Sequence, residues 1–115
     1  MVSRKKYIPK RGDLVWVSFN PRSGHEQAGR CPAAVLSPLA YNNKAGLAIM
    51  CPITSQIKGY PFEVIIPDKL TIAGVILSDQ IKNLDWRERN AEYICSLPND
   101  IISEVLQKLI AILTE

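Results

Sequence analysis

The chain has 115 residues, of which 47% are hydrophobic and 22% charged, and its formal net charge is +3. This length fits one domain covering residues 1–115, and the composition excludes an intrinsically disordered chain. No apolar run reaches the roughly 20 residues that a membrane-spanning helix needs, and the basic start of the chain lacks the apolar segment of a signal peptide. We therefore expect a cytoplasmic protein that makes no membrane contact.

Cysteine and histidine usage limits the chemistry. Cys31, Cys51 and Cys95 form no Cys-x-x-Cys pair, and an odd number of cysteines is a poor disulfide framework, so we expect three reduced thiols. His25 is the one histidine of the sequence. We therefore expect no metal site and no cofactor. The mild positive charge does not by itself identify a nucleic-acid partner.

Short apolar segments bounded by Gly, Pro and Asn predict strands along the first two-thirds of the chain. In Asp13–Phe19, both alternating sets are largely apolar, which predicts a strand covered on both faces. A polar loop from Asn20 to Arg30 follows, and Asn42–Gly46 predicts a turn. Further strands or short extended segments are expected at 33–37, 47–53, 62–66, 74–78, 81–84 and 91–95.

After Pro98 the apolar residues follow a helical period and form one wide face. They are Ile101, Ile102, Val105, Leu106, Leu109, Ile110 and Leu113. Asn99 is the expected N-cap, and so wide a face must be buried against the sheet or against another subunit. Short strands closed by a terminal helix predict a mainly β fold with α, a small antiparallel barrel with a C-terminal helix. The residue pattern alone assigns no function.

Four segments in order resemble the MazF/PemK toxin family, and the likeness runs from about Arg11 to Thr114. They are RGDLVWV from Arg11, NPRSGHEQAG from Asn20 with its continuation PAAVLSP from Pro32, CPITSQ from Cys51 with KGYPFEV from Lys58, and GVILSDQ from Gly74. The resemblance implies an SH3-like antiparallel barrel, a homodimer, and the toxin of a type II toxin–antitoxin system. It implies a metal-independent, sequence-specific endoribonuclease that cleaves single-stranded RNA or mRNA, neutralised by a MazE/PemI-like antitoxin with an acidic disordered tail.

Cleavage of RNA without metal uses the 2′-hydroxyl as nucleophile and needs a base, an acid and a group that stabilises the phosphorane charge. On the resemblance, Glu26 is the expected general base, and His25 beside it is suited to proton transfer or RNA contact. Thr54 is expected to hold a phosphate oxygen. Asp79 is either an acid–base group or a buried residue that bonds loop amides, and both interpretations stay open.

The sequence departs from the family at the arginine that precedes the proline of the second strand, because Cys31 stands at this position. A thiol cannot provide a cationic clamp for phosphate. Arg30 is one residue earlier, and alternation along a strand places it on the opposite face. Either the chain is a weakened or inactive variant, or the loop shifts by one residue and Arg30 takes the catalytic role.

The remaining expected RNA contacts are polar, basic or aromatic residues in or beside the loops that line the groove. They are Arg22, Gln27, Ser55, Gln56, Lys58, Tyr60, Gln80, Lys82 and Arg87. Trp16 and Trp86 are interpreted as core or interface residues.

Two other functions fit the same fold. A toxin that poisons DNA gyrase ends in an aromatic residue on its last helix, whereas this chain ends in Ile112-Leu113-Thr114-Glu115. A catalytically inactive module that binds RNA or antitoxin is the second alternative, and Cys31 favours it.

Overall fold

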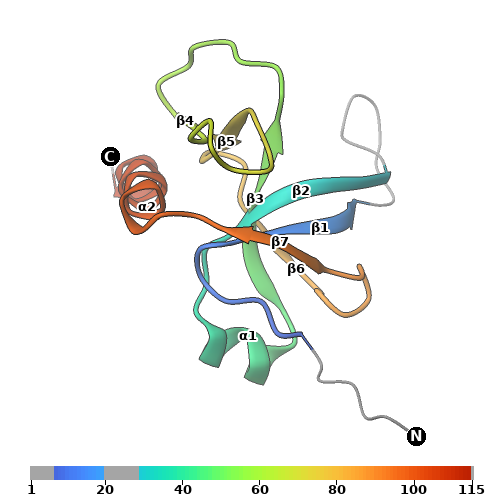
Figure 1. The fold of residues 1–115 in the computed structure, drawn as a ribbon. Helices are drawn as coiled ribbons and strands as arrows, with labels where there is room; N and C mark the ends of the chain where they lie inside the picture. The colour runs from blue at the N-terminus through green and yellow to red at the C-terminus, as the bar shows by residue number, and fades with distance from the viewer. Residues whose placement is uncertain (1–6, 20–28, 115) are drawn as a thin grey trace, which may run out of the picture.

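The computed structural model describes residues 7–19 and 29–114, which contain seven strands and two helices (Figure 1). In chain order these are β1 (Asp13–Phe19), β2 (Gly29–Val35), α1 (Leu39–Ala45), β3 (Ala48–Thr54), β4 (Glu63–Ile65), β5 (Val75–Leu77), β6 (Lys82–Leu84), β7 (Glu92–Ser96) and α2 (Asn99–Thr114). The predicted mainly β fold with a C-terminal helix is confirmed. β2 begins at Gly29 instead of the expected Ala33.

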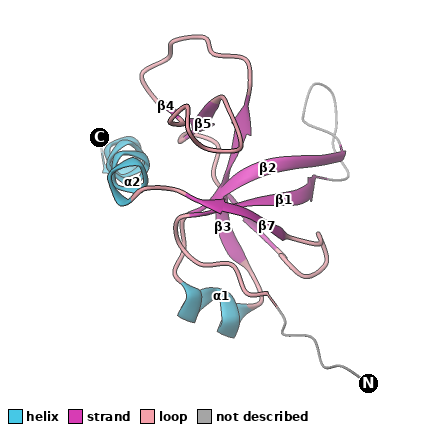
Figure 2. Ribbon diagram, in the orientation of Figure 1, coloured by secondary structure: helices cyan, strands magenta, loops and turns pink. Residues whose placement is uncertain are grey.

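Figure 2 shows the strands in magenta and the two helices in cyan. All strand pairs are antiparallel, in the order β4-β5-β3-β2-β1-β7, and β6 also pairs with β3. β3 is the central strand, because its start pairs with β6, its middle with β2 and its end with β5. The path through the described strands ends at β4 and β7. The fold is therefore an open, barrel-like sheet, and the end of β3 is where its two parts meet.

Alternation along the strands divides the core into two clusters. Leu14 belongs to the cluster that packs beneath α2, while Val15 and Val17 belong to the other, which closes around Trp86. The predicted cover of β1 is thus confirmed along the face of Val15 and Val17, and on the opposite face at Leu14; Trp86 is confirmed as a core residue. Trp16 is 36% exposed and is not a core residue; its place in an interface stays a prediction.

The predicted turn at Asn42–Gly46 is wrong, because residues 42–45 belong to helix α1 and Gly46 caps its end. Asn42 is fully buried and donates from Nδ2 to the carbonyls of Pro9 (2.7 Å) and Ser37 (3.0 Å). Its own carbonyl accepts from the Trp86 indole at 3.0 Å. These long-range bonds outweigh the low helix propensity of asparagine. Gly46, with φ 72°, ends the helix in the left-handed conformation.

Helix α2 begins at Asn99, and the Pro98 carbonyl accepts from the Ile102 amide, so Pro98 holds the capping position expected for Asn99. Ile102 and Val105 are buried against the sheet. Ile110 and Leu113, farther along the predicted apolar face, are exposed in the single chain. Burial against the sheet is therefore confirmed for the first half of the face. Neither helix of the described chain is long and apolar enough to cross a membrane.

Candidate functional site

A groove of about 1070 Å³ lies where the start of β2, the end of β3, the β3–β4 loop and β6 meet. It brings together many of the residues predicted from the sequence: Arg30, Cys31, Thr54, Ser55, Gln56, Lys58, Tyr60, Gln80 and Lys82. Arg22, His25, Glu26 and Gln27 lie outside the described residues. Polar, basic and aromatic groups distant in sequence therefore share one concave surface.

Two predicted site residues do not line this groove. Asp79 follows β5 and is exposed, so the interpretation of Asp79 as a buried residue is wrong. The Arg87 guanidinium lies over the Trp86 ring, 4.8 Å from its centroid. This stacking directs Arg87 toward the core tryptophan.

Thr54, the last residue of β3, is fixed by two local contacts. Its Oγ1 accepts a hydrogen bond from the Gln56 amide at 3.1 Å, which turns the chain into the β3–β4 loop and leaves the hydroxyl proton available for donation. Gly74, the residue before β5, packs closely against the Thr54 backbone, since a Cβ on Gly74 would lie 2.3 Å from the Thr54 carbonyl oxygen. Thr54 is thus held at the groove with little positional freedom.

Cys31 and Arg30 face opposite sides of β2. Cys31 is 7% exposed and packs with Val17 in the cluster around Trp86, and burial raises the pKa of its thiol, which is therefore neutral near pH 7. Arg30 donates to Glu92 Oε1 and to the Asn90 carbonyl, both at 2.6 Å. The register pairs Val17 with Cys31, so no one-residue shift brings Arg30 to the position of Cys31. Alternation, as predicted, separates the two side chains.

Two other cations line the groove. Lys82 pairs with Met50 of β3, and its Nζ lies 5.7 Å from the centroid of the Phe19 ring. Met50 and Phe19 belong to the same cluster as Cys31, so Lys82 extends on the side of the sheet that carries Cys31. Arg89, which sequence reasoning missed, donates to the Ser18 carbonyl at 3.0 Å and also lines the groove. Nothing in the sequence distinguished Arg89 from its charged neighbours.

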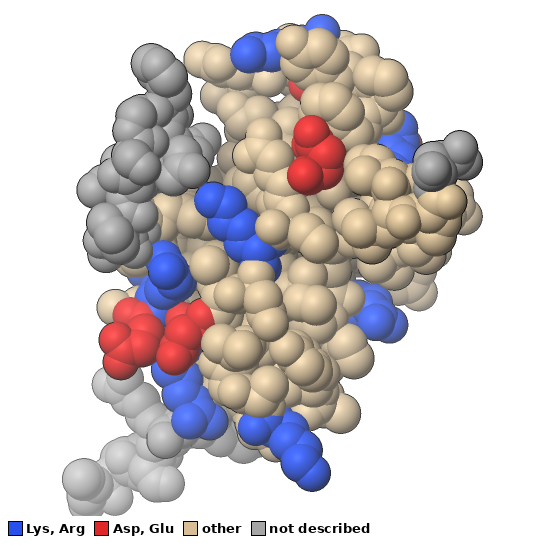
Figure 3. Space-filling model, turned by 180° about the vertical axis from the view of Figure 1, so that it is seen from behind, with Lys and Arg blue, Asp and Glu red and all other residues tan. Residues whose placement is uncertain are grey.

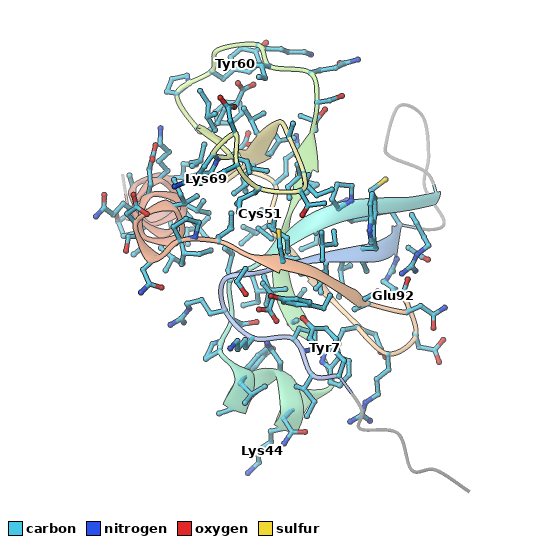
Figure 4. All side chains as sticks on the ribbon, in the orientation of Figure 1. Tyr7, Lys44, Cys51, Tyr60, Lys69 and Glu92 are labelled. Atoms are coloured by element: carbon cyan, nitrogen blue, oxygen red, sulfur yellow. The ribbon has the colours of Figure 1, made fainter. Side chains whose placement is uncertain are left out.

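The β3–β4 loop forms the outer wall of the groove, with Tyr60 near its tip (Figure 4). The rings of Tyr60 and Phe62 stack with centroids 5.2 Å apart. Glu63, which sequence reasoning also missed as a site residue, lines the groove and is buried although it is charged. The available signal was a charged residue within the otherwise apolar predicted strand 62–66.

Basic side chains are spread over the face shown in Figure 3 instead of forming one block. The described ranges 7–19 and 29–114 contain no cluster of three or more His, Cys, Asp or Glu residues that could hold a metal ion. What the described groove offers is a hydroxyl, amides, aromatic rings and separate cations, a set suited to binding a flexible anionic chain.

A family model described as PemK-like, MazF-like toxin of type II toxin–antitoxin system matches residues 10–113. The chain belongs to this family. The endoribonuclease toxin MazF of Escherichia coli K12 is 54% identical to it over 91 residues, which are 79% of each chain. The endoribonuclease PemK of E. coli is 32% identical over 118 residues, covering 96% of this chain and 86% of PemK.

Solved structures of the family agree with the fold. MazF of Deinococcus radiodurans superimposes with a TM-score of 0.90 at 51% identity, covering 96% of this chain and all 100% of that one. The same toxin in a MazE–MazF crystal structure gives a TM-score of 0.87 at 52% identity, over 94% of this chain and 97% of that one.

Proposed function

We propose that this PemK/MazF-family chain is an endoribonuclease toxin of a type II toxin–antitoxin system and that the groove beside Thr54 is its RNA site. The observation that carries this proposal is the convergence of Thr54, the β3–β4 loop and Lys82 on one groove. A relative that is 54% identical over 91 residues bears the name endoribonuclease toxin MazF.

The proposed reaction needs no metal ion. The ribose 2′-oxygen attacks the adjacent phosphorus, its proton passes to Glu26, and the P–O5′ bond breaks to leave a 2′,3′-cyclic phosphate and a 5′-hydroxyl. His25 is assigned to protonate the leaving oxygen, because Asp79 does not line the groove. The Thr54 hydroxyl donates to a phosphate oxygen, and the Lys82 ammonium stabilises the phosphorane charge. Cys31, a neutral thiol, adds no charge there, which predicts slow cleavage.

Recognition of single-stranded RNA is assigned to the groove walls. Tyr60 provides a ring on which an unpaired base can stack, and Lys58 supplies phosphate contact. Ser55, Gln56 and Gln80 offer hydrogen bonds to base edges.

A MazE-like antitoxin is the proposed protein partner, because structures similar to this chain include MazE–MazF complexes. An acidic tail would compete with RNA for the cations of the same groove. We also propose that the toxin is a cytoplasmic homodimer, in which the exposed apolar residues of α2, including Ile110 and Leu113, contribute to subunit contact.

Cys31 supports one second candidate, a module that binds RNA or antitoxin without cutting. The test is incubation of the purified chain with mixed-sequence single-stranded RNA in EDTA, analysed for 5′-hydroxyl products. The proposal expects slow cleavage that Glu26→Gln lowers by about a hundredfold or more. Binding without cleavage supports the module, and inhibition of gyrase without either supports the gyrase toxin.

A further inference from the structure

The β3–β4 loop, residues 55–62, has no regular secondary structure and is mostly exposed. Gly59 within it has φ +81°, which places the backbone in the left-handed region. Within the loop the Tyr60 and Phe62 rings stack, and contacts from outside it hold the backbone at Lys58, Gly59 and Pro61 as well.

Glu63 of β4 supplies the first of these contacts. Its carboxylate accepts hydrogen bonds from the Gly59 amide at 3.0 Å and from the Lys58 amide at 3.3 Å. Hydrogen bonds from backbone amides to a carboxylate are about twice as strong as those between neutral groups. Since the Glu63 side chain is nearly buried, the two amides also satisfy a charge that would be costly to leave alone.

Lys108 of helix α2 supplies the second contact, from the other end of the loop. Its ammonium donates to the Pro61 carbonyl, and Glu104 one turn earlier lies 3.8 Å from Lys108 Nζ. Helix α2 is anchored to the sheet by Ile102 and Val105. The loop is thus fastened to β4 through Glu63 and to α2 through Lys108.

We propose that Glu63 and Lys108 are positioning residues that set the affinity of the groove for RNA by fixing residues 55–62 as its wall. This rests on the proposed function of the groove. Neither residue needs to touch the scissile phosphate. Their contacts fix Lys58 and Tyr60 in place before RNA arrives, so that binding does not have to order the loop.

The test compares Glu63→Leu, Glu63→Gln and Lys108→Met with the wild type. The matched controls are Glu88→Gln and Lys44→Met, which change exposed groups outside the groove. Three quantities are measured: exchange rates of the Lys58 and Gly59 amide hydrogens, the Kd of a labelled 2′-O-methyl RNA of mixed sequence, and the KM and kcat of RNA cleavage. Circular dichroism verifies that each variant is folded.

We expect Glu63→Leu to accelerate exchange at both amides by about tenfold or more and to raise Kd and KM by about tenfold, with kcat changed less than about threefold. Glu63→Gln keeps an acceptor oxygen and should recover most of the affinity. Lys108→Met alters an exposed contact without threatening the fold, and should raise Kd by about threefold.

The proposal is overturned if the Lys58 and Gly59 amide hydrogens exchange at the wild-type rate in Glu63→Leu. It is also overturned if they exchange faster while the Kd for RNA stays unchanged. A fall in kcat at constant KM also overturns it. If the wild type binds RNA without cutting it, the proposed ribonuclease activity is wrong. The amide exchange rates and the Kd for RNA then still test the positioning role of Glu63 and Lys108. If Glu63→Leu does not fold, Glu63→Gln and Lys108→Met decide by the same measurements.

Discussion

Arg30 and Glu92 form an ion pair at 2.6 Å across β1, on the face of the sheet opposite to Cys31. The guanidinium also donates to Ser18 Oγ at 3.2 Å, and so connects β2, β1 and β7. We therefore predict that Arg30→Met lowers the free energy of unfolding by about 1–2 kcal/mol and changes kcat less than about threefold. Urea denaturation and RNA cleavage rates measure the two effects.

Glu92→Gln is the control for this prediction. Because both partners are partly or largely exposed, loss of the ion pair alone should cost less than about 1 kcal/mol. A hundredfold loss of kcat in Arg30→Met, with stability unchanged, would instead assign Arg30 to catalysis.

Cys31→Arg should raise the rate of RNA cleavage by about a hundredfold, because it places a cation on the side of the sheet that also carries Lys82, where the thiol is neutral. Single-turnover cleavage in EDTA measures the change, and growth arrest on induction gives a second readout. Cys31→Ser is the control, since it changes polarity without adding charge. Equal rates for wild type and Cys31→Arg would show that the departure from the family is harmless.

Local patterns were sufficient for most of the fold. Alternation located β1 and the helical period located α2, because both reflect burial of one face against the core. Helix α1 was not predicted, because Asn42 is held in it by hydrogen bonds with Pro9 and Trp86, which are distant in sequence. No local pattern records such bonds.

The site residues likewise fall into those that the sequence predicted and those that depend on distant contacts. Thr54 and the residues that follow it were found through the family resemblance, and the groove brings them together. Glu63 and Lys108 were missed because their roles depend on contacts with loop atoms, in the case of Lys108 with a carbonyl 47 positions away. Their residue types alone give no indication of such partners.

Gly74→Ala should both destabilise the protein and impair cleavage. The added Cβ would lie 2.3 Å from the Thr54 carbonyl oxygen and 3.3 Å from Ser55 Cα, and Gly74 has φ +129°, where side chains are strained. We expect a loss of about 2–4 kcal/mol in the free energy of unfolding and a fall in kcat of about tenfold or more, because Thr54 must move.

Gly46→Ala provides the comparison, since it also replaces a glycine of positive φ but meets no atom within 4 Å and lies away from the groove. It should cost about 1 kcal/mol and leave kcat unchanged. If both variants cleave at the wild-type rate, close packing at Gly74 does not control the position of Thr54.

Cys51 should make stability fall in alkaline solution. Burial, and secondly the charge of Asp79, raise the pKa of its thiol from 9.0 to about 12 in the folded chain. Between these values the unfolded chain loses the thiol proton while the folded chain retains it, so the free energy of unfolding decreases as the pH rises above about 9, by at most about 1.4 kcal/mol per pH unit from this group. Below pH 9 the contribution of the Cys51 thiol to the free energy of unfolding is complete.

Urea denaturation of wild type and Cys51→Ala from pH 8 to 10.5 isolates this contribution, because other groups that titrate in this range, including Tyr7, act equally in both proteins. Cys51→Ala should be less stable at pH 8, where it lacks the buried thiol, and should lose less stability with rising pH; identical slopes would contradict the assignment.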